Sequence, residues 1–463
     1  MANTRNRQVD VPCILAIDCG STSFKAALFS RNLDRMGEYS LKVPYIRNDG
    51  TFCEMDPIAV RKVTEDLVRG ISETTGIHAD KAGKIAITSQ AQTFTIVDAN
   101  GKTPIPLISW IDTRAKAESE ELVERIGQDF HTHCSFPNPI PQLTLTKLLW
   151  CKKHKPDVLN PANRILTLPS FVGRSFAEST HAIDRNIGAM GGLYSLREGG
   201  WRGDATSICG VERNMLEELV DTGQGLAMPD GREIVFAGND QTAGAWGNGC
   251  TADTVVVTLG TALVAYRYAG EEPGPYSEEC CWGPYPGGGY YELATRDEGC
   301  LALDWARDEI MPDQNIKDFD RAARKTIPRV DEQSGFFFPN RMRTADAWKG
   351  RFEKPDQNAY AVLEGISFSL KQLLFEEMRC ARNTRFKAIG GGSQSDLWMQ
   401  MTADVLGSPV TRGNGDSLLG AAMMAIGRRV DLRDGGCFQP NQKRQNLFER
   451  RYDRWRKLAT EGG

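Results

Sequence analysis

Short apolar runs that end at glycine or at small polar residues recur along the chain and predict buried strands that feed loops. The clearest case is the segment 234–263. Its first apolar run stops at Gly238-Asn239-Asp240, and its second run, residues 254–259, stops at Gly260-Thr261. Short runs ended by glycine are typical of buried strands. This segment therefore predicts one strand that ends at an acid and a second that ends at a Gly-Thr turn.

The same pattern occurs near the start of the chain. Residues 13–17 and 24–29 are apolar, and the polar segment Asp18-Cys19-Gly20-Ser21-Thr22-Ser23 joins them. Residues 254–259 and 262–268 repeat this arrangement around Gly260-Thr261. A strand, a small-residue turn and a returning strand at the head of each half indicate two related lobes. Each lobe would point one phosphate-sized loop at a shared cleft.

Helix and strand signals alternate over the rest of the chain. Asp56 followed by Pro57 is typical of a helix N-terminus. The pattern predicts further helices at 111–127, 143–153, 356–379 and 397–406, strands at 84–88, 164–168 and 386–389, and hairpins or loops at 93–110 and 274–291. Such alternation indicates α/β layers. We place the lobes at residues 11–250 and 251–435, followed by an extension, 436–463, whose basic segment after Pro440 predicts a terminal helix.

Composition narrows the class of protein. The chain has 463 residues, of which 40% are apolar and 25% charged, so we expect a globular protein of two or three domains. A net charge of −4 argues against a nucleic-acid partner, and no run reaches membrane-spanning length. The first apolar run is interrupted at Asp18, which favours a strand over a signal peptide. Twelve scattered cysteines without a secretion signal favour reduced thiols and a cytoplasmic location.

The residues that follow the two predicted strands, Asp240 and Gly260-Thr261, suggest phosphoryl transfer. An acid such as Asp240 can take a proton from a hydroxyl, and a Gly-Thr turn can offer backbone N–H groups to a phosphate. The sequence contains neither GxxxxGK[ST] nor GxGxxG, so a nucleotide would bind in the cleft between the lobes. A third candidate, the cluster of His131, His133 and Cys134, has no second group of ligands nearby, and we interpret it as a solvated loop rather than a metal site.

A series of segments in fixed order points to a family. The segments are ILAIDCGSTSFKAALF, SQAQTFTIVD, WIDTR, AGNDQTAGAWGNG, TLGTAL, LEGISFSLKQLL and IGGGSQSDLWMQMTADVLGSPV. Together they resemble the FGGY carbohydrate kinases, over roughly residues 11–427, and xylulokinase-like members most closely. The resemblance implies an α/β fold of two actin-like (ribonuclease H-like) lobes around a central nucleotide and sugar cleft.

The resemblance also implies the catalytic acids. Asp240 matches the family's general base, which accepts the proton of the attacking hydroxyl. Without the family series, Asp240 would be interpreted as the acidic N-cap of a helix that starts near Gln241. Asp18 matches the first acidic position, close to the metal, so Asp18 and Asp240 together would suit Mg²⁺. The alternative for Asp18 is a turn aspartate that bonds its own loop.

The nucleotide site implied by the resemblance comes from three glycine-rich segments. The first phosphate loop and its strand, the second phosphate loop and the adenosine segment contribute Gly20, Ser21, Thr22, Ser23, Lys25, Gly260, Thr261, Gly390, Gly391, Gly392, Ser393 and Ser395. Glycine lets the backbone approach a phosphate closely, and hydroxyl and N–H groups meet its oxygens. Taken singly, each segment is an ordinary turn, and Lys25 is equally compatible with a surface strand.

The acceptor side implied by the resemblance comprises Gln90, Gln92, Trp110, Asp112 and Asp240. Here the sequence departs from the family, because Ala91-Gln92 stands where xylulokinases show Met-His and glycerol kinases Arg-Glu. Trp110 suits either a sugar face or the core, and Asp112 with Arg114 suits a structural ion pair. The family's GERxP loop is also absent after residues 337–340.

These observations predict ATP- and Mg²⁺-dependent phosphorylation of a small-molecule sugar, a ketopentose such as xylulose. Two alternatives stay open. One is a kinase for another acceptor, such as glycerol, ribulose, a methylpentulose or a hexulose. The other is a non-kinase ATP-binding member of the actin-like superfamily. The sequence predicts no membrane or nucleic-acid partner, and it is compatible with a homodimer without revealing the oligomeric state.

Overall fold

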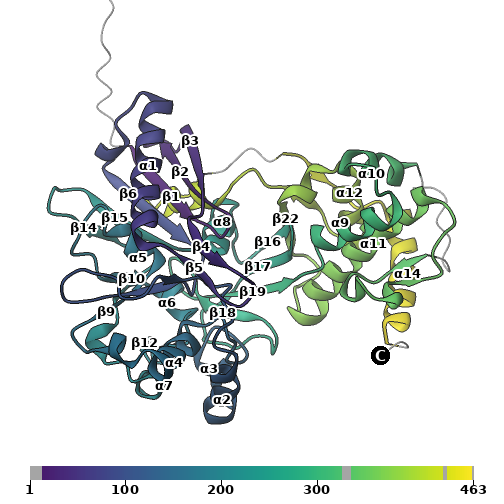
Figure 1. Cartoon of the computed structure of the whole chain (residues 1–463). Coiled ribbons are helices and arrows are strands. Elements are labelled where there is room, and N and C mark those ends of the chain that lie inside the picture. Colours follow the sequence, from purple (N-terminus) through teal and green to yellow (C-terminus); the bar gives the residue numbers. More distant parts are fainter. Residues whose placement is uncertain (1–12, 326–334, 431–434, 461–463) are drawn as a thin grey trace, which may run out of the picture.

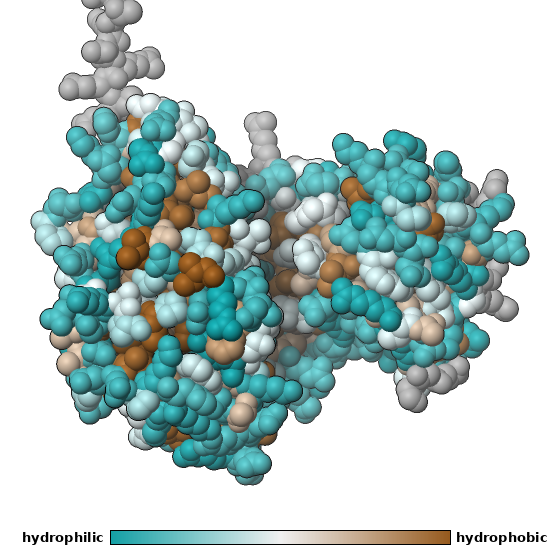
Figure 2. Space-filling view, viewed as in Figure 1, coloured by the Kyte–Doolittle hydropathy of each residue, from teal (hydrophilic) through white to brown (hydrophobic). Residues whose placement is uncertain are grey.

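The computed structural model describes residues 13–325, 335–430 and 435–460, and they form two lobes that lie side by side (Figure 1). A deep groove separates the lobes on the face shown in Figure 2. The mixed α/β fold and the two lobes are as the sequence predicted. All twelve cysteines are free. None of the helices among the described residues is long and apolar enough to cross a bilayer.

The first lobe is built on a six-stranded sheet of order β14-β15-β6-β1-β2-β3. Strands β1 to β3 form an antiparallel meander, and β6 and β15 extend it in parallel with β1. Their bounds are β1 Ile14–Cys19, β2 Ser23–Phe29, β3 Arg35–Lys42, β6 Lys84–Ser89, β14 Gly225–Ala227 and β15 Glu233–Asn239. Because parallel strands end at the same edge, the carboxyl ends of β1, β6 and β15 bring Asp18, Gln90 and Asp240 to one side of the sheet.

The second lobe repeats this plan in a seven-stranded sheet of order β18-β19-β17-β16-β22-β23-β24. Strands β16, β17 and β19 form the meander, and β22 and β23 add to β16 in parallel. Their bounds are β16 Thr254–Leu259, β17 Leu263–Gly270, β18 Cys281–Pro284, β19 Tyr290–Arg296, β22 Arg385–Ile389, β23 Val410–Arg412 and β24 Cys437–Phe438. The matching topology confirms the repeat predicted from the two strand-turn-strand segments. The β18–β19 pair confirms a hairpin within 274–291.

An insertion carries a third core in the first lobe. Its sheet has the order β4-β5-β8-β7-β9, and helices α2, α3, α4 and α7 accompany it. The bounds are β4 Tyr45–Asn48, β5 Cys53–Met55, β7 Phe94–Val97, β8 Leu107–Ile108, β9 Arg164–Thr167, α2 Lys116–Ile126, α3 Phe130–His133, α4 Thr144–His154 and α7 Gly203–Cys209. The antiparallel β7–β8 contact confirms the predicted hairpin within 93–110.

The cluster at His131, His133 and Cys134 is not a solvated loop, and that prediction was wrong. The two histidines belong to the short helix α3 and are half-buried, while Cys134 is buried. The His131 ring bonds the Cys280 carbonyl and the His133 ring bonds the Ser195 hydroxyl. The His131 contact joins the two lobes, because Cys280 immediately precedes β18 of the second lobe, whereas the His133 contact lies within the first lobe, where Ser195 belongs to β11.

Helices cover both sheets. Asp56 caps α1 (Pro57–Thr75) as predicted, since its carboxylate accepts from the N–H groups of Ile58 and Ala59. The other first-lobe elements are α5 Leu168–Gly173, α6 Arg185–Ala189, β10 Ala182–Asp184, β11 Tyr194–Ser195, β12 Gly200–Trp201, β13 Glu218–Val220 and α8 Asp240–Gly247. Those of the second half are α9 Cys300–Ile310, α10 Ile316–Arg324, β20 Phe336–Phe337, β21 Trp348–Lys349, α11 Pro355–Gln372, α12 Asp396–Leu406, α13 Ser417–Ala425 and α14 Gln442–Thr460.

The terminal helix predicted after Pro440 is α14, and it is firmly docked. Its Arg451 is buried and makes two bonds of 2.6 Å with the Glu364 carboxylate on α11. Trp455, also buried, donates its indole N–H to the Phe337 carbonyl at 2.9 Å. The extension is therefore part of the second lobe's core.

Helix α13 belongs to the second half of the chain but packs on the first lobe. Residues 251–435 were assigned to the second lobe, yet the buried face of α13 packs against β1, β6 and β15 of the first sheet. It also crosses α8, where Gly420 lies against the backbone of Ala243 and Gly247. Helices α8 and α13 thus pack against each other, and their first residues, Asp240 and Ser417, line the same cavity.

Candidate functional site

A cavity of about 280 Å³ lies where the two lobes meet the N-termini of α8 and α13. Asp18 and Asp240 line it from the ends of β1 and β15, Thr258 and Gly390 from the ends of β16 and β22, and Asp416 and Ser417 from the start of α13. The lobes therefore bring together residues that are far apart in the sequence, and the cavity is the candidate active site.

Asp240 is placed by a polar network at the junction of β15 and α8. The strand is irregular between Phe236 and Asn239, with Gly238 at a φ of +71°. Asn239 is the N-cap, because its side-chain oxygen accepts from Thr242 N at 3.0 Å. Asn186 fixes Asn239 by accepting from its backbone and side-chain N–H groups. Asp240 is the first helical residue, so the alternative interpretation of Asp240 as the N-cap was wrong.

Both acids at the cavity have raised pKa values. Burial raises the pKa of Asp240 to about 7, and the neighbouring Asp18 carboxylate adds to this shift. Burial also raises the pKa of Asp18 to about 6, although a hydrogen bond from Ser417 and the charge of Lys25 oppose the rise. An acid with a pKa near neutrality is well suited to accept a proton at physiological pH.

Asp18 also has the chemistry of a cation ligand. Its Oδ2 accepts from the Ser417 hydroxyl at 2.6 Å, whereas its buried Oδ1 has no hydrogen-bond partner. An orphaned carboxylate oxygen facing a cavity fits a divalent cation. Within the described residues, no group of three or more acidic, histidine or cysteine side chains could hold a metal unaided. Mg²⁺ needs only one or two carboxylates when water and phosphate oxygens complete its shell.

The predicted first phosphate loop follows Asp18 directly. Gln90 approaches the Gly20 carbonyl with its side-chain amide at 3.4 Å, and Tyr45 donates its hydroxyl to the Ser21 carbonyl at 3.0 Å. These contacts fix the loop from its carbonyl side. Thr22 is exposed and Ser23 half-buried at the start of β2, and the side chain of Lys25 is exposed.

The predicted second phosphate loop and the predicted adenosine segment lie against each other. A Cβ added to Gly390, whose φ is +91°, would come within 2.8 Å of the Leu259 carbonyl and 3.2 Å of Gly260 N. Backbone bonds from Cys300 and Leu301 hold the carbonyls of Gly260 and Thr261. Only glycine fits at position 390, and a Cβ at Gly392 would lie 2.4 Å from the Trp398 ring, whereas a Cβ at Gly391 would meet nothing within 4 Å.

The hydroxyl groups of the adenosine segment have partners within the chain. Ser393 is buried and donates to the Gly390 carbonyl at 2.7 Å. Ser395 caps α12 by accepting from Trp398 N, and its hydroxyl bonds the Asp320 carboxylate. Gly391 is exposed and Gly392 buried. Gly390 and Gly391 therefore present the accessible surface of this segment, and the two serines hold its shape.

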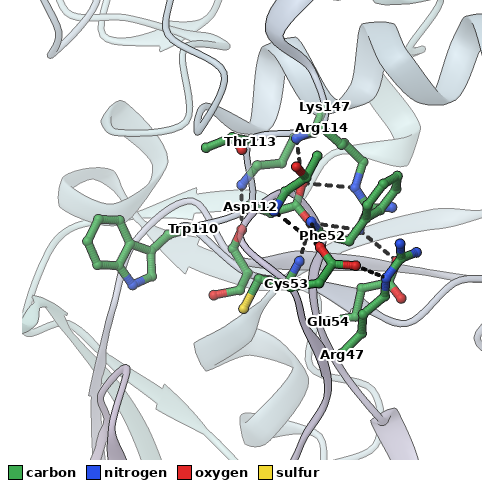
Figure 3. Close-up of polar contacts among 12 residues, drawn as sticks. Arg47, Phe52, Cys53, Glu54, Trp110, Asp112, Thr113, Arg114 and Lys147 are labelled. Carbon is green, nitrogen blue, oxygen red and sulfur yellow. Dashed lines mark hydrogen bonds and ion pairs between the residues drawn. The ribbon is translucent and has the colours of Figure 1, made fainter.

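On the acceptor side, two glutamines and a tryptophan stand near the end of β6. Gln90 is buried and its Oε1 has no partner. Gln92 is buried and holds a φ of +61°, a left-handed conformation that costs free energy outside glycine. Trp110 is 37% exposed, so its interpretation as a core residue was wrong. Figure 3 shows its ring pointing away from the polar network beside it.

Asp112 is the centre of that network. It is completely buried, and its oxygens accept from Cys53 N and from the backbone and guanidinium of Arg114. Arg114 also bonds Glu54 and lies over the rings of Phe52 and Trp150. The structural ion pair of Asp112 and Arg114 is confirmed. These bonds bury Asp112 completely, and its predicted contact with the acceptor stays a prediction.

Sequence reasoning missed the contribution of α13 to the site. Asp416 caps this helix by accepting a hydrogen bond from Leu419 N. Its carboxylate also accepts a hydrogen bond from Arg35, and its charge contributes to the raised pKa of Asp18. Ser417 bonds Asp18 directly. The signal that could have pointed here is the segment Asn414-Gly415-Asp416-Ser417 ahead of an apolar run, which is a typical helix start.

Comparison with known proteins gives matches along almost the whole chain. The N-terminal and C-terminal domain models of the FGGY family of carbohydrate kinases match residues 13–259 and 255–427. A gluconokinase from Bacillus subtilis is 23% identical over 89% of this chain and 87% of its own. A glycerol kinase from Brucella ovis is 27% identical over 94% of both chains. The crystal structure of a xylulose kinase from Rhodospirillum rubrum superposes with a TM-score of 0.85, at 21% identity over 97% of this chain and 98% of that one.

Proposed function

The chain belongs to the FGGY family of carbohydrate kinases, and on that premise we propose that it phosphorylates a neutral ketose, a ketopentose such as xylulose, with Asp240 as general base. The protein is a sugar kinase that uses ATP, as members of this family do. The observation that carries the proposal is the position of Asp240 beside Asp18 in a cavity that both lobes line.

The proposed reaction is an in-line transfer. Asp240 accepts the proton of a sugar hydroxyl while that oxygen forms a bond to the γ-phosphorus of ATP. The bond from the γ-phosphorus to the bridging oxygen breaks, and ADP leaves with the electron pair. Such a transfer depends mainly on positioning and on charge stabilisation, and the raised pKa of Asp240 supports its role as the base.

The orphaned Oδ1 of Asp18 supports a role in holding Mg²⁺, with Asp240 close by. A bound Mg²⁺ would neutralise charge on the phosphate oxygens during transfer. Ser417 orients the Asp18 carboxylate through the 2.6 Å hydrogen bond to its other oxygen. The backbone N–H groups of the loops at Gly20 and Gly260, with the surface of Gly390 and Gly391, are proposed to bind the nucleotide.

Charge supports a neutral acceptor over a sugar acid. Among the described residues that line the cavity, Asp18, Asp240 and Asp416 are acidic and none is basic. The polar side chains on the acceptor side, Gln90 and Gln92, are uncharged amides. Because Gln90 and Gln92 offer no positive charge to a substrate carboxylate, a neutral acceptor is favoured over gluconate and similar acids. The Ala91-Gln92 segment leaves other neutral acceptors, such as glycerol or ribulose, as the second candidate.

A sugar panel tests the proposal. Purified protein with ATP and Mg²⁺ should release ADP faster on addition of xylulose than of ribulose, glycerol or gluconate, as measured in a coupled assay. Asp240→Asn should reduce kcat by about 10²–10⁴-fold with little change in the KM for ATP, because it removes the base and keeps the shape. Asp230→Asn, at an exposed turn of the same lobe, is the matched control. Preference for gluconate would overturn the neutral acceptor, and full activity of Asp240→Asn would overturn the base.

A further inference from the structure

Lys147 is a completely buried lysine directly beneath the acceptor side of the site. It lies on α4, which packs in a leucine-rich core, and Figure 3 shows it above the polar network around Asp112. Burying an ammonium group costs free energy that an apolar side chain of the same length would not. The contacts of the amine indicate what offsets this cost.

The amine holds the two acceptor segments by their backbones. Its Nζ donates to the Ser109 carbonyl at 2.7 Å, immediately before Trp110, and approaches the Gln92 carbonyl at 3.5 Å. Thr144, one turn earlier on α4, donates its hydroxyl to the same Gln92 carbonyl at 3.4 Å. Both segments whose side chains are proposed to contact the sugar therefore converge on one turn of α4.

The backbone at these segments needs external support. Gln92 has a φ of +61°, which a residue with a side chain holds only when its surroundings impose it. Trp110 protrudes into solvent. Its backbone N–H donates to the Thr93 hydroxyl at 3.0 Å and holds the residue in place. An apolar residue at position 147 could not donate to either carbonyl, so the segments would lose a shared anchor.

Neighbouring charges make the position tolerable for a lysine. Asp112 attracts the amine, whereas Arg114 repels it and is itself paired with Asp112 and Glu54. Burial nevertheless lowers the pKa of Lys147 to about 7. Lys147 donates hydrogen bonds in either protonation state, so its anchoring contacts do not depend on its charge.

We propose that Lys147 is a positioning residue for the site of the sugar acceptor. By binding the carbonyls of Gln92 and Ser109, Lys147 sets the location of Gln92 and Trp110. This proposal rests on the proposed function, since it assigns Lys147 a role within the same acceptor site. Lys147 does not touch the substrate. It acts through the backbone of the two segments, and its loss should affect sugar binding and leave the nucleotide side unchanged.

The test is Lys147→Met, which keeps the length of the side chain and removes the donor. The KM for the best acceptor of the sugar panel should rise at least about tenfold, with the KM for ATP within about twofold of the wild-type value. Lys371→Met is the matched control, because Lys371 is an equally buried lysine that pairs with Glu449 in the second lobe. It should lower thermal stability to a similar extent and leave the sugar KM unchanged.

Thr144→Val provides a milder probe if Lys147→Met folds poorly. It removes the second bond to the Gln92 carbonyl and keeps a β-branched side chain of the same size, so we expect a smaller rise in the sugar KM alone. An unchanged sugar KM in both variants, or an equal rise in the sugar and ATP KM values, overturns the positioning role while the kinase assignment stands. Absence of turnover with every sugar in the wild-type protein would instead overturn the proposed function.

Discussion

The crossing of α8 and α13 at Gly420 offers a stringent test of how the two lobes are held together. A Cβ at Gly420 would lie 1.8 Å from the Ala243 carbonyl oxygen and 2.9 Å from Gly247 N. Cβ atoms are essentially never found closer than 3.0 Å to another group, and the obstacle here is helix backbone, which cannot rotate away. Gly420→Ala must therefore push the helices apart by about 1 Å.

The expected cost follows from two opposing terms. Overpacking of a close-packed contact costs typically 1–3 kcal/mol, and contact with backbone places this case at about 3 kcal/mol. Replacing glycine by alanine within a helix returns about 1 kcal/mol. The net loss is thus about 2 kcal/mol. Gly244→Ala on α8 is the stability control, because its Cβ would meet nothing within 4 Å and should instead stabilise the helix by up to about 1 kcal/mol.

Urea unfolding measures the loss of stability in Gly420→Ala, and steady-state kinetics measure the loss of activity. The urea midpoint of Gly420→Ala should fall below that of the wild type, and the midpoint of Gly244→Ala should equal or exceed it. Because α8 begins at Asp240 and α13 at Ser417, separation of the helices should also reduce kcat by up to about 10²-fold. If Gly420→Ala matched Gly244→Ala in stability, the close crossing of the two helices would be wrong.

Three further outcomes follow from the buried carboxyl groups. Because Asp240 accepts a proton only when ionised, kcat/KM should rise with pH, with the midpoint of the rise near the Asp240 pKa of about 7. A kcat/KM that stayed constant from about pH 5 to 9 would contradict the role of Asp240 as the base. Asp18→Asn should move this midpoint to lower pH, since it removes the charge that helps to raise the pKa of Asp240, and should also weaken the Mg²⁺ dependence of the remaining activity. Glu217 is buried, and burial raises its pKa from 4.5 to about 8, so the folded state retains a proton that the unfolded chain releases. Its contribution to stability is complete below about pH 4.5 and is lost as pH rises through about 8, so Glu217→Gln should flatten the pH dependence of the urea midpoint in this range.

Local signals predicted the elements well because their causes lie within a few residues. Asp56 caps α1, the strand after Lys84 ends at the acceptor segment, and the acid at the end of β15 lies at the cleft, as the sequence indicated. The cap of α8 shows the limit of this reasoning. Both Asn239 and Asp240 are good capping residues, and the choice of Asn239 depends on its bonds with Asn186, which comes from a distant part of the chain.

The sequence by itself determined that the chain contains two similar α/β units, in each of which the first strand ends in a small-residue turn. It also determined that an acid, Asp240, stands at the end of the apolar run that begins at Ile234. Periodicity and turn chemistry act over short separations, so one chain is enough to detect them. Only the tertiary structure decided that α13 packs on the first lobe, that Ser417 bonds Asp18, and that Lys147 lies beneath Gln92 and Trp110. These contacts join residues distant in sequence, and their distances depend on how whole layers pack, which no local pattern encodes.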